Sequence, residues 1–156
     1  NAPGSVFSLP GAVLALLGLL AMVGALLSVS LAPPGDDGIR LGVRSAIAGS
    51  ILTIFGYQLV GLGLVSTVVG DPARKSSDPL TTWLAEHLTL SSGLVVGVLL
   101  CMLGGAGASA ILLRWWTAGY PSLPPVTYDV LAWTVIVLGG QTILAALSVG
   151  TLGPRS

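Results

Sequence analysis

Residues 9–32 read LPGAVLALLGLLAMVGALLSVSLA, a stretch of 24 residues without a single charge. A helix that crosses the hydrocarbon core of a bilayer needs about 20 mostly apolar residues, so this stretch predicts a membrane span. Pro10 falls in the first turn of the predicted helix, where its missing N–H leaves no helical hydrogen bond unmade. Three further stretches with uncharged interiors follow, at residues 45–69, 91–113 and 128–152. The sequence therefore predicts an all-α membrane protein with four transmembrane helices.

The composition excludes most soluble folds. Hydrophobic residues make up 53% of the chain and charged residues only 8%, and the mean hydropathy is +0.94. A soluble domain carries roughly a quarter charged residues. The net charge of zero gives no electrostatic footprint for nucleic acid, which we exclude as a partner. With Cys101 as the single cysteine, no disulfide can form within the chain.

The connections between the predicted spans differ in length. Segments 33–44 and 114–127 are short and rich in proline or glycine, as tight helical hairpins require. Segment 70–90 is longer, and Asp78 is placed to cap a helix that begins at Pro79. Trp83 and Leu84 then fall on an apolar face, which predicts a short helix lying in the membrane interface between the second and third spans. The alternative is a loop whose apolar residues pack against the ends of the bundle.

The four spans read as two copies of one hairpin. Gln58 lies 47 residues after Gly11, and Gln141 lies 48 residues after Gly93. Each glutamine stands 11 residues from the end of its span, which places both about 16 Å from the same interface. An amide in hydrocarbon is costly without partners, so both glutamines are expected to face the bundle interior. They either hydrogen-bond across helices or line a groove for a polar-headed lipid.

The chain contains no recognisable catalytic group. His87 is the only histidine and sits in the predicted interfacial segment, and no span carries a carboxylate in its interior. Taken alone, the chain is therefore not predicted to be an enzyme. It begins at Asn1 rather than at methionine, and we expect it to be the membrane part, residues 1–156, of a longer polypeptide.

Several short sequences, in order along nearly the whole chain, resemble one family. Val6-Phe7-Ser8-Leu9-Pro10-Gly11, Phe55-Gly56-Tyr57-Gln58, Leu94-Val95-Val96-Gly97 and Gly139-Gly140-Gln141-Thr142 resemble the C-terminal membrane domain of bacterial family 2 glycosyltransferases, of the polyprenyl-phosphate and dolichol-phosphate sugar synthase type. Two places depart from that pattern. Ser91-Ser92 stands where such proteins often have a Glu-Arg pair, and Gly42-Val43-Arg44 where they often have an Asp or His.

The resemblance implies a division of labour. A cytosolic catalytic domain before Asn1 would hold the divalent metal and the nucleotide sugar, and the chain itself would hold no cofactor. The four helices would anchor that domain in the plasma membrane, with both termini cytosolic, and bind a polyprenyl-phosphate carrier. Arg74 and Lys75 would meet the lipid phosphate and Tyr57, Gln58 and Gln141 the carrier, although simple attraction to anionic headgroups explains Arg74 and Lys75 equally well.

The predicted function is thus that of a membrane anchor and carrier-binding domain of a glycosyltransferase. The alternative is a free-standing small membrane protein that binds or flips a lipid-linked sugar, or an accessory subunit of a membrane complex. A homo-oligomer is compatible with either.

Overall fold

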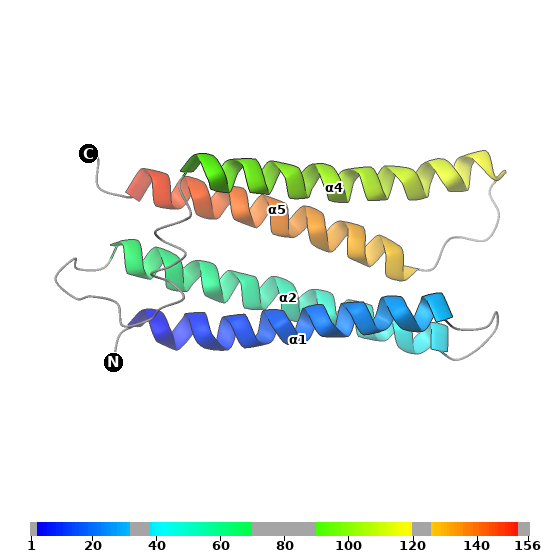
Figure 1. The fold of residues 1–156 in the computed structure, drawn as a ribbon, viewed down its shortest axis with the longest axis horizontal. Helices are drawn as coiled ribbons and strands as arrows, with labels where there is room; N and C mark the ends of the chain where they lie inside the picture. The colour runs from blue at the N-terminus through cyan, green and yellow to red at the C-terminus, as the bar shows by residue number, and fades with distance from the viewer. Residues whose placement is uncertain (1–2, 32–37, 70–89, 120–125, 153–156) are drawn as a thin grey trace.

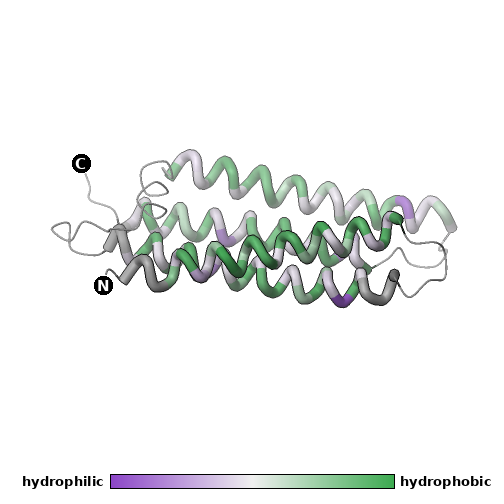
Figure 2. The backbone as a smooth tube through the Cα atoms, turned by 60° about the horizontal axis from the view of Figure 1, so that its bottom comes forward, coloured by the Kyte–Doolittle hydropathy of each residue, from purple (hydrophilic) through white to green (hydrophobic). Residues whose placement is uncertain are grey.

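The computed structural model describes residues 3–31, 38–69, 90–119 and 126–152. They form four helices, α1 (Pro3–Leu31), α2 (Gly38–Val69), α4 (Leu90–Thr117) and α5 (Val126–Leu152), and these described ranges contain no strand. Each helix is long and apolar enough to cross a membrane, and Figure 2 shows apolar residues along most of its length. The predicted all-α fold with four transmembrane helices is confirmed. The predicted interfacial helix falls outside the described residues.

Three helix ends lie well beyond the predicted span ends. α1 begins at Pro3 rather than Leu9, α2 at Gly38 rather than Ser45, and α4 ends at Thr117 rather than Leu113. The apolar stretches mark the part of each helix that lies in hydrocarbon, whereas the helical hydrogen bonds continue past it into the headgroup region. Charged side chains such as Arg44 and Arg114 are therefore carried on helical turns and not on loops.

The end of α4 shows what stops such a helix. The Thr117 hydroxyl donates to the carbonyl oxygen of Leu113 at 2.9 Å, and the Gly119 N–H donates to the carbonyl of Trp116 at 3.1 Å. Gly119 has φ +74°, in the left-handed region that glycine adopts without steric cost. The helix thus ends at a glycine cap after the tryptophans.

The four helices form two antiparallel pairs, the first hairpin (α1 and α2) and the second hairpin (α4 and α5), drawn in Figure 1 in the order α1, α2, α5, α4. The main contact between the hairpins joins α2 and α5, with a smaller one between α1 and α5. α2 and α5 run in the same direction, and α1 begins at the end of the molecule where α5 finishes (Figure 1). We call this the termini end.

Glycines allow the backbones of the first hairpin to touch. A Cβ atom added at Gly11 would lie 2.8 Å from the carbonyl oxygen of Gly56 and 2.9 Å from the amide nitrogen of Val60. A Cβ at Gly18 would lie 2.5 Å from the carbonyl oxygen of Gly49. Such close approach is typical of membrane helices that pack through small residues, where lipid supplies no hydrophobic driving force.

The second hairpin repeats these contacts. A Cβ added at Gly97 would lie 2.8 Å from the carbonyl oxygen of Gly139 and 3.0 Å from the amide nitrogen of Ile143, and one at Gly104 would lie 2.8 Å from the carbonyl oxygen of Ala132. Adding 86 to each position in α1 and 83 to each position in α2 converts the first set of contacts into the second. The two hairpins are therefore structurally equivalent, residue by residue.

This equivalence corrects one part of the predicted repeat. Gln58 does correspond to Gln141, but Gly11 corresponds to Gly97 and not to Gly93, one helical turn away. Gly93 and Gly97 lie four residues apart on the same face of α4 and are both buried. The sequence alone could not show which of them is the equivalent of Gly11.

Candidate lipid-binding site

The two hairpins are joined by hydroxyl groups along the contact of α2 with α5, which we call the seam. Ser50 Oγ lies 2.7 Å from Thr134 Oγ1, and Tyr57 Oη lies 2.6 Å from Thr142 Oγ1. Both threonines also donate within α5, to the carbonyl oxygens of Val130 (2.6 Å) and Leu138 (2.7 Å). Since a hydroxyl has one hydrogen, each threonine accepts across the seam and the donors are Ser50 and Tyr57.

This direction of donation predicts unequal effects of removing the two partners. Thr142→Val leaves the Tyr57 hydroxyl without its acceptor in a medium of low dielectric, and we expect a loss of about 1–2 kcal/mol of unfolding free energy. Tyr57→Phe removes the donor while Thr142 keeps its bond to Leu138, and we expect about 0.5 kcal/mol. The unfolding free energies of both variants can be measured in mixed detergent micelles.

The double variant provides the control. Tyr57→Phe/Thr142→Val removes both hydroxyls and should be more stable than Thr142→Val alone, because no donor is left unpaired. Additive losses from the two single substitutions would contradict this assignment of donor and acceptor.

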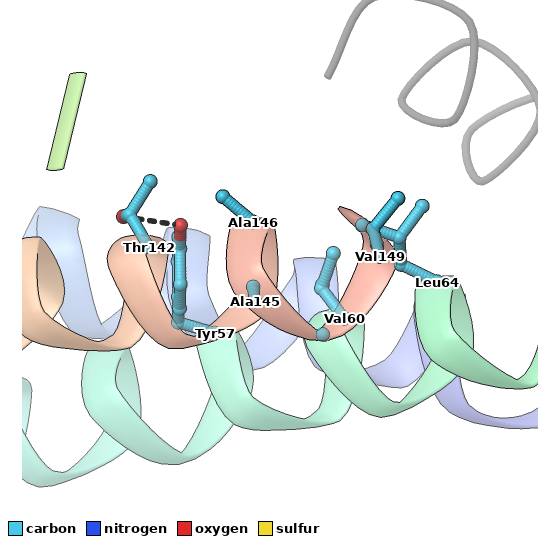
Figure 3. A pocket seen from close by; sticks show the side chains of 8 residues that line it. Tyr57, Val60, Leu64, Thr142, Ala145, Ala146 and Val149 are labelled. Atoms are coloured by element: carbon cyan, nitrogen blue, oxygen red, sulfur yellow. Dashed lines mark hydrogen bonds between the residues drawn. The ribbon is translucent and has the colours of Figure 1, made fainter. Parts of the chain in front are cut away.

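A narrow groove continues from this hydroxyl pair towards the termini end. It has a volume of about 60 Å³, and its lining comes from the second halves of α2 and α5 (Figure 3): Tyr57, Val60, Gly61, Leu64, Thr142, Ala145, Ala146 and Val149. The lining is apolar apart from the Tyr57 and Thr142 hydroxyls at its inner end, where Figure 3 shows the bond between them. A groove of this size is too small for a bulky headgroup, and its apolar lining is compatible with a short length of hydrocarbon chain.

Gly61 lines the groove and has open space around it. A Cβ atom added there would meet nothing within 4 Å, unlike one at Gly56 on the preceding turns, which would meet the carbonyl oxygen of Gly11 at 2.5 Å. Leu64 and Ala146 are almost fully buried at 3% and 4% exposure and form the groove floor. Gly61 is therefore a lining position at which a side chain can be added without moving the helices.

The predicted site residues separate in the structure. Tyr57 lines the groove, and Gln141 lies directly before Thr142, with a buried side-chain oxygen that has no hydrogen-bond partner among the described residues. Gln58 is exposed, so the prediction that it faces the bundle interior is wrong. Arg74 and Lys75 lie outside the described residues.

The exposure of Gln58 has a geometric cause. The seam uses Ser50 and Tyr57 on α2 but Thr134 and Thr142 on α5, and the equivalents of these threonines in α2 are Ile51 and Leu59. The hairpins thus meet through different faces of equivalent helices. Equivalent residues share a depth but not an environment, and Gln58 falls on a face of α2 that none of the described helices covers.

Sequence reasoning missed Thr142 and the small residues after it. The available signal was the spacing of hydroxyl residues inside apolar spans, since Ser50 and Tyr57 are seven residues apart and Thr134 and Thr142 eight. Both spacings correspond to about two helical turns and place each pair on one face. A matching pair of such faces indicates two helices that meet side by side.

Comparison with known proteins now identifies the family. The sequence profile of the glycosyltransferase family 2 C-terminal transmembrane region matches residues 72–153. The chain belongs to this family, and the resemblance noted from its short motifs is confirmed.

One curated relative supports this assignment. The chain is 37% identical over 153 residues to the low-salt glycan biosynthesis hexosyltransferase Agl6 of Haloferax volcanii, in an alignment that covers 98% of this chain and 36% of the relative. The chain therefore spans about a third of the length of that relative. No solved structure matches it.

Proposed function

We propose that this chain is the membrane domain of a glycosyltransferase that moves a sugar from a nucleotide sugar to a polyprenyl phosphate, and that the groove beside Tyr57 holds part of the carrier chain. Support comes from the family membership and from the relative, which is named as a hexosyltransferase. The observation that carries the proposal is the apolar groove that runs between the hairpins towards the termini end. A catalytic domain attached before residue 1 would lie at that end.

In this proposal the carrier lies along α2 and α5 with its phosphate at the termini end. Arg74 and Lys75, five and six residues after the end of α2, follow a helix that lines the groove and would meet the phosphate. A nucleotide sugar and a divalent metal would be held by the catalytic domain. The chain's own contribution is to hold the acceptor at a fixed depth and lateral position, which lowers the entropic cost of the encounter.

A domain replacement separates carrier binding from simple anchoring. In the full-length enzyme, residues 1–156 are exchanged for an unrelated four-span segment that keeps both ends on the same side of the membrane. We expect transfer to polyprenyl phosphate in vesicles to fall by at least about tenfold, which corresponds to ~1.4 kcal/mol of lost carrier binding. Hydrolysis of the nucleotide sugar reports on the catalytic domain and should persist. Transfer at the wild-type rate by the exchanged protein would show that this domain serves only as a membrane anchor.

We further propose that the domain resides in the plasma membrane with both termini cytosolic. Four spans put the two ends on one side, and the even count alone leaves that side undetermined. A cysteine introduced by Ser156→Cys should resist a membrane-impermeant thiol reagent in intact cells and react after lysis. Ready labelling in intact cells would show the opposite orientation.

A further inference from the structure

A second, larger groove lies at the other end of the molecule, between α1 and the second hairpin. Its volume is about 800 Å³, within the usual range for pockets that bind small molecules. Val29 on α1 forms one edge, and the second half of α4 and the first half of α5 form the rest. It is separate from the groove beside Tyr57, with which it shares no lining residue.

The groove is open because α4 presents small residues to it. Gly104, Gly107 and Ala110 line it at intervals of three residues. The tight contact of α4 with α5 ends at Gly104. A Cβ added at Gly107 would have its nearest neighbour at 3.8 Å, in ordinary contact with Ala132. The helices diverge from this point towards the end of α4, and the space between them widens.

The polarity of the lining changes along the groove. Leu103 and Val135 mark its inner part, whereas Arg114, Trp115 and Tyr128 lie where α4 ends and α5 begins. The α4 residues that line it extend from Leu103 to Trp115, a rise of about 18 Å, which is more than half of the roughly 30 Å hydrocarbon core. Tryptophan, tyrosine and arginine at the outer end are typical of the headgroup region.

We propose that this groove binds one anionic membrane phospholipid in the leaflet opposite the termini end, with an acyl chain between α1 and α4 and its phosphate at Arg114. Among the described residues that line the groove, Arg114 is the only charged one, so its charge favours a negative headgroup. The apolar walls exclude water, and a lipid chain is the apolar molecule present at that depth. The bound lipid would fill the space between α1 and the second hairpin.

The test uses the full-length protein in nanodiscs that contain spin-labelled phosphatidylglycerol or spin-labelled phosphatidylcholine. The wild type should show an immobilised lipid component that favours phosphatidylglycerol. Arg114→Gln should lower this preference by about fivefold, the factor that corresponds to ~1 kcal/mol for one basic residue near an anionic headgroup. Arg44→Gln is the matched control, because Arg44 is exposed on α2 towards the same membrane face and does not line the groove.

A second pair of variants tests the chain site independently of charge. Ala110→Phe fills the groove and should remove the immobilised component for both lipids. Ala106→Phe, on an exposed position of α4 outside the groove, should retain it. Equal effects of the two arginine variants would show general attraction to the surface, and would overturn the proposal. A second result would also overturn the proposal. If the wild type excludes both labelled lipids and forms a dimer in one nanodisc, a second copy of the chain occupies the groove.

Discussion

Gly139→Ala is expected to destabilise the membrane domain by about 1–3 kcal/mol, whereas Gly140→Ala should leave it unchanged or slightly more stable. The added methyl at Gly139 would lie 2.7 Å from the carbonyl oxygen of Gly97 and 2.7 Å from the amide nitrogen of Cys101. Both are backbone atoms, so α4 and α5 must move apart to admit it, and overpacking of this kind costs a few kcal/mol.

The adjacent Gly140 provides the control because it has the same residue type, helix and depth. A Cβ there would meet nothing within 4 Å, and alanine favours the helix more than glycine does. Unfolding free energies in mixed micelles measure both variants. Because Gly56 is the equivalent of Gly139, Gly56→Ala should reproduce the loss in the first hairpin. Similar stabilities for Gly139→Ala and Gly140→Ala would refute close backbone packing as the basis of the hairpins.

Gly61→Leu in the full-length enzyme is expected to lower transfer to polyprenyl phosphate by about tenfold, through a higher KM for the carrier. Gly61 lines the groove beside Tyr57, and a Cβ there meets nothing within 4 Å, so a leucine side chain can be added at the groove without displacing a backbone. The KM for the nucleotide sugar should stay the same, because the substitution is confined to the membrane. Stability should also be nearly unchanged.

Gly24→Leu is the comparison for this effect. Gly24 also has open space around it, but it is exposed on α1 and lines neither groove. The same side chain is thus added to the membrane domain at a place where no carrier is expected. If both variants transfer sugar at the wild-type rate, the carrier chain does not lie in this groove.

The four spans could be predicted because membrane insertion depends on local composition. An uncharged stretch such as residues 9–32 has no soluble alternative, whatever its neighbours do. The exact ends of the helices could not be predicted in this way. For example, α2 begins at Gly38, seven residues before its apolar stretch. Hydropathy detects the hydrocarbon core, and helix ends depend on hydrogen bonds and on caps such as Gly119.

The candidate site was harder to predict than the fold. The repeat correctly paired Gln58 with Gln141, because each has the same place in its hairpin. Their environments could not be derived from that pairing, since they depend on which faces of α2 and α5 meet. Tyr57 and Thr142 contribute to this pairing of faces, because their hydroxyls form a hydrogen bond with each other only when the two helices lie side by side. The sequence of one helix contains no information on its partner's register.

The packing of the two hairpins gives the domain an uneven stiffness. Within each hairpin, glycines bring backbone against backbone, as at Gly11 with Gly56 and Gly97 with Gly139, and such contacts allow almost no sliding. Between the hairpins, the seam rests on side-chain hydroxyls and small apolar groups, which tolerate small rotations. Thickness changes or lateral pressure in the bilayer should therefore be absorbed at the seam, with each hairpin moving as a unit.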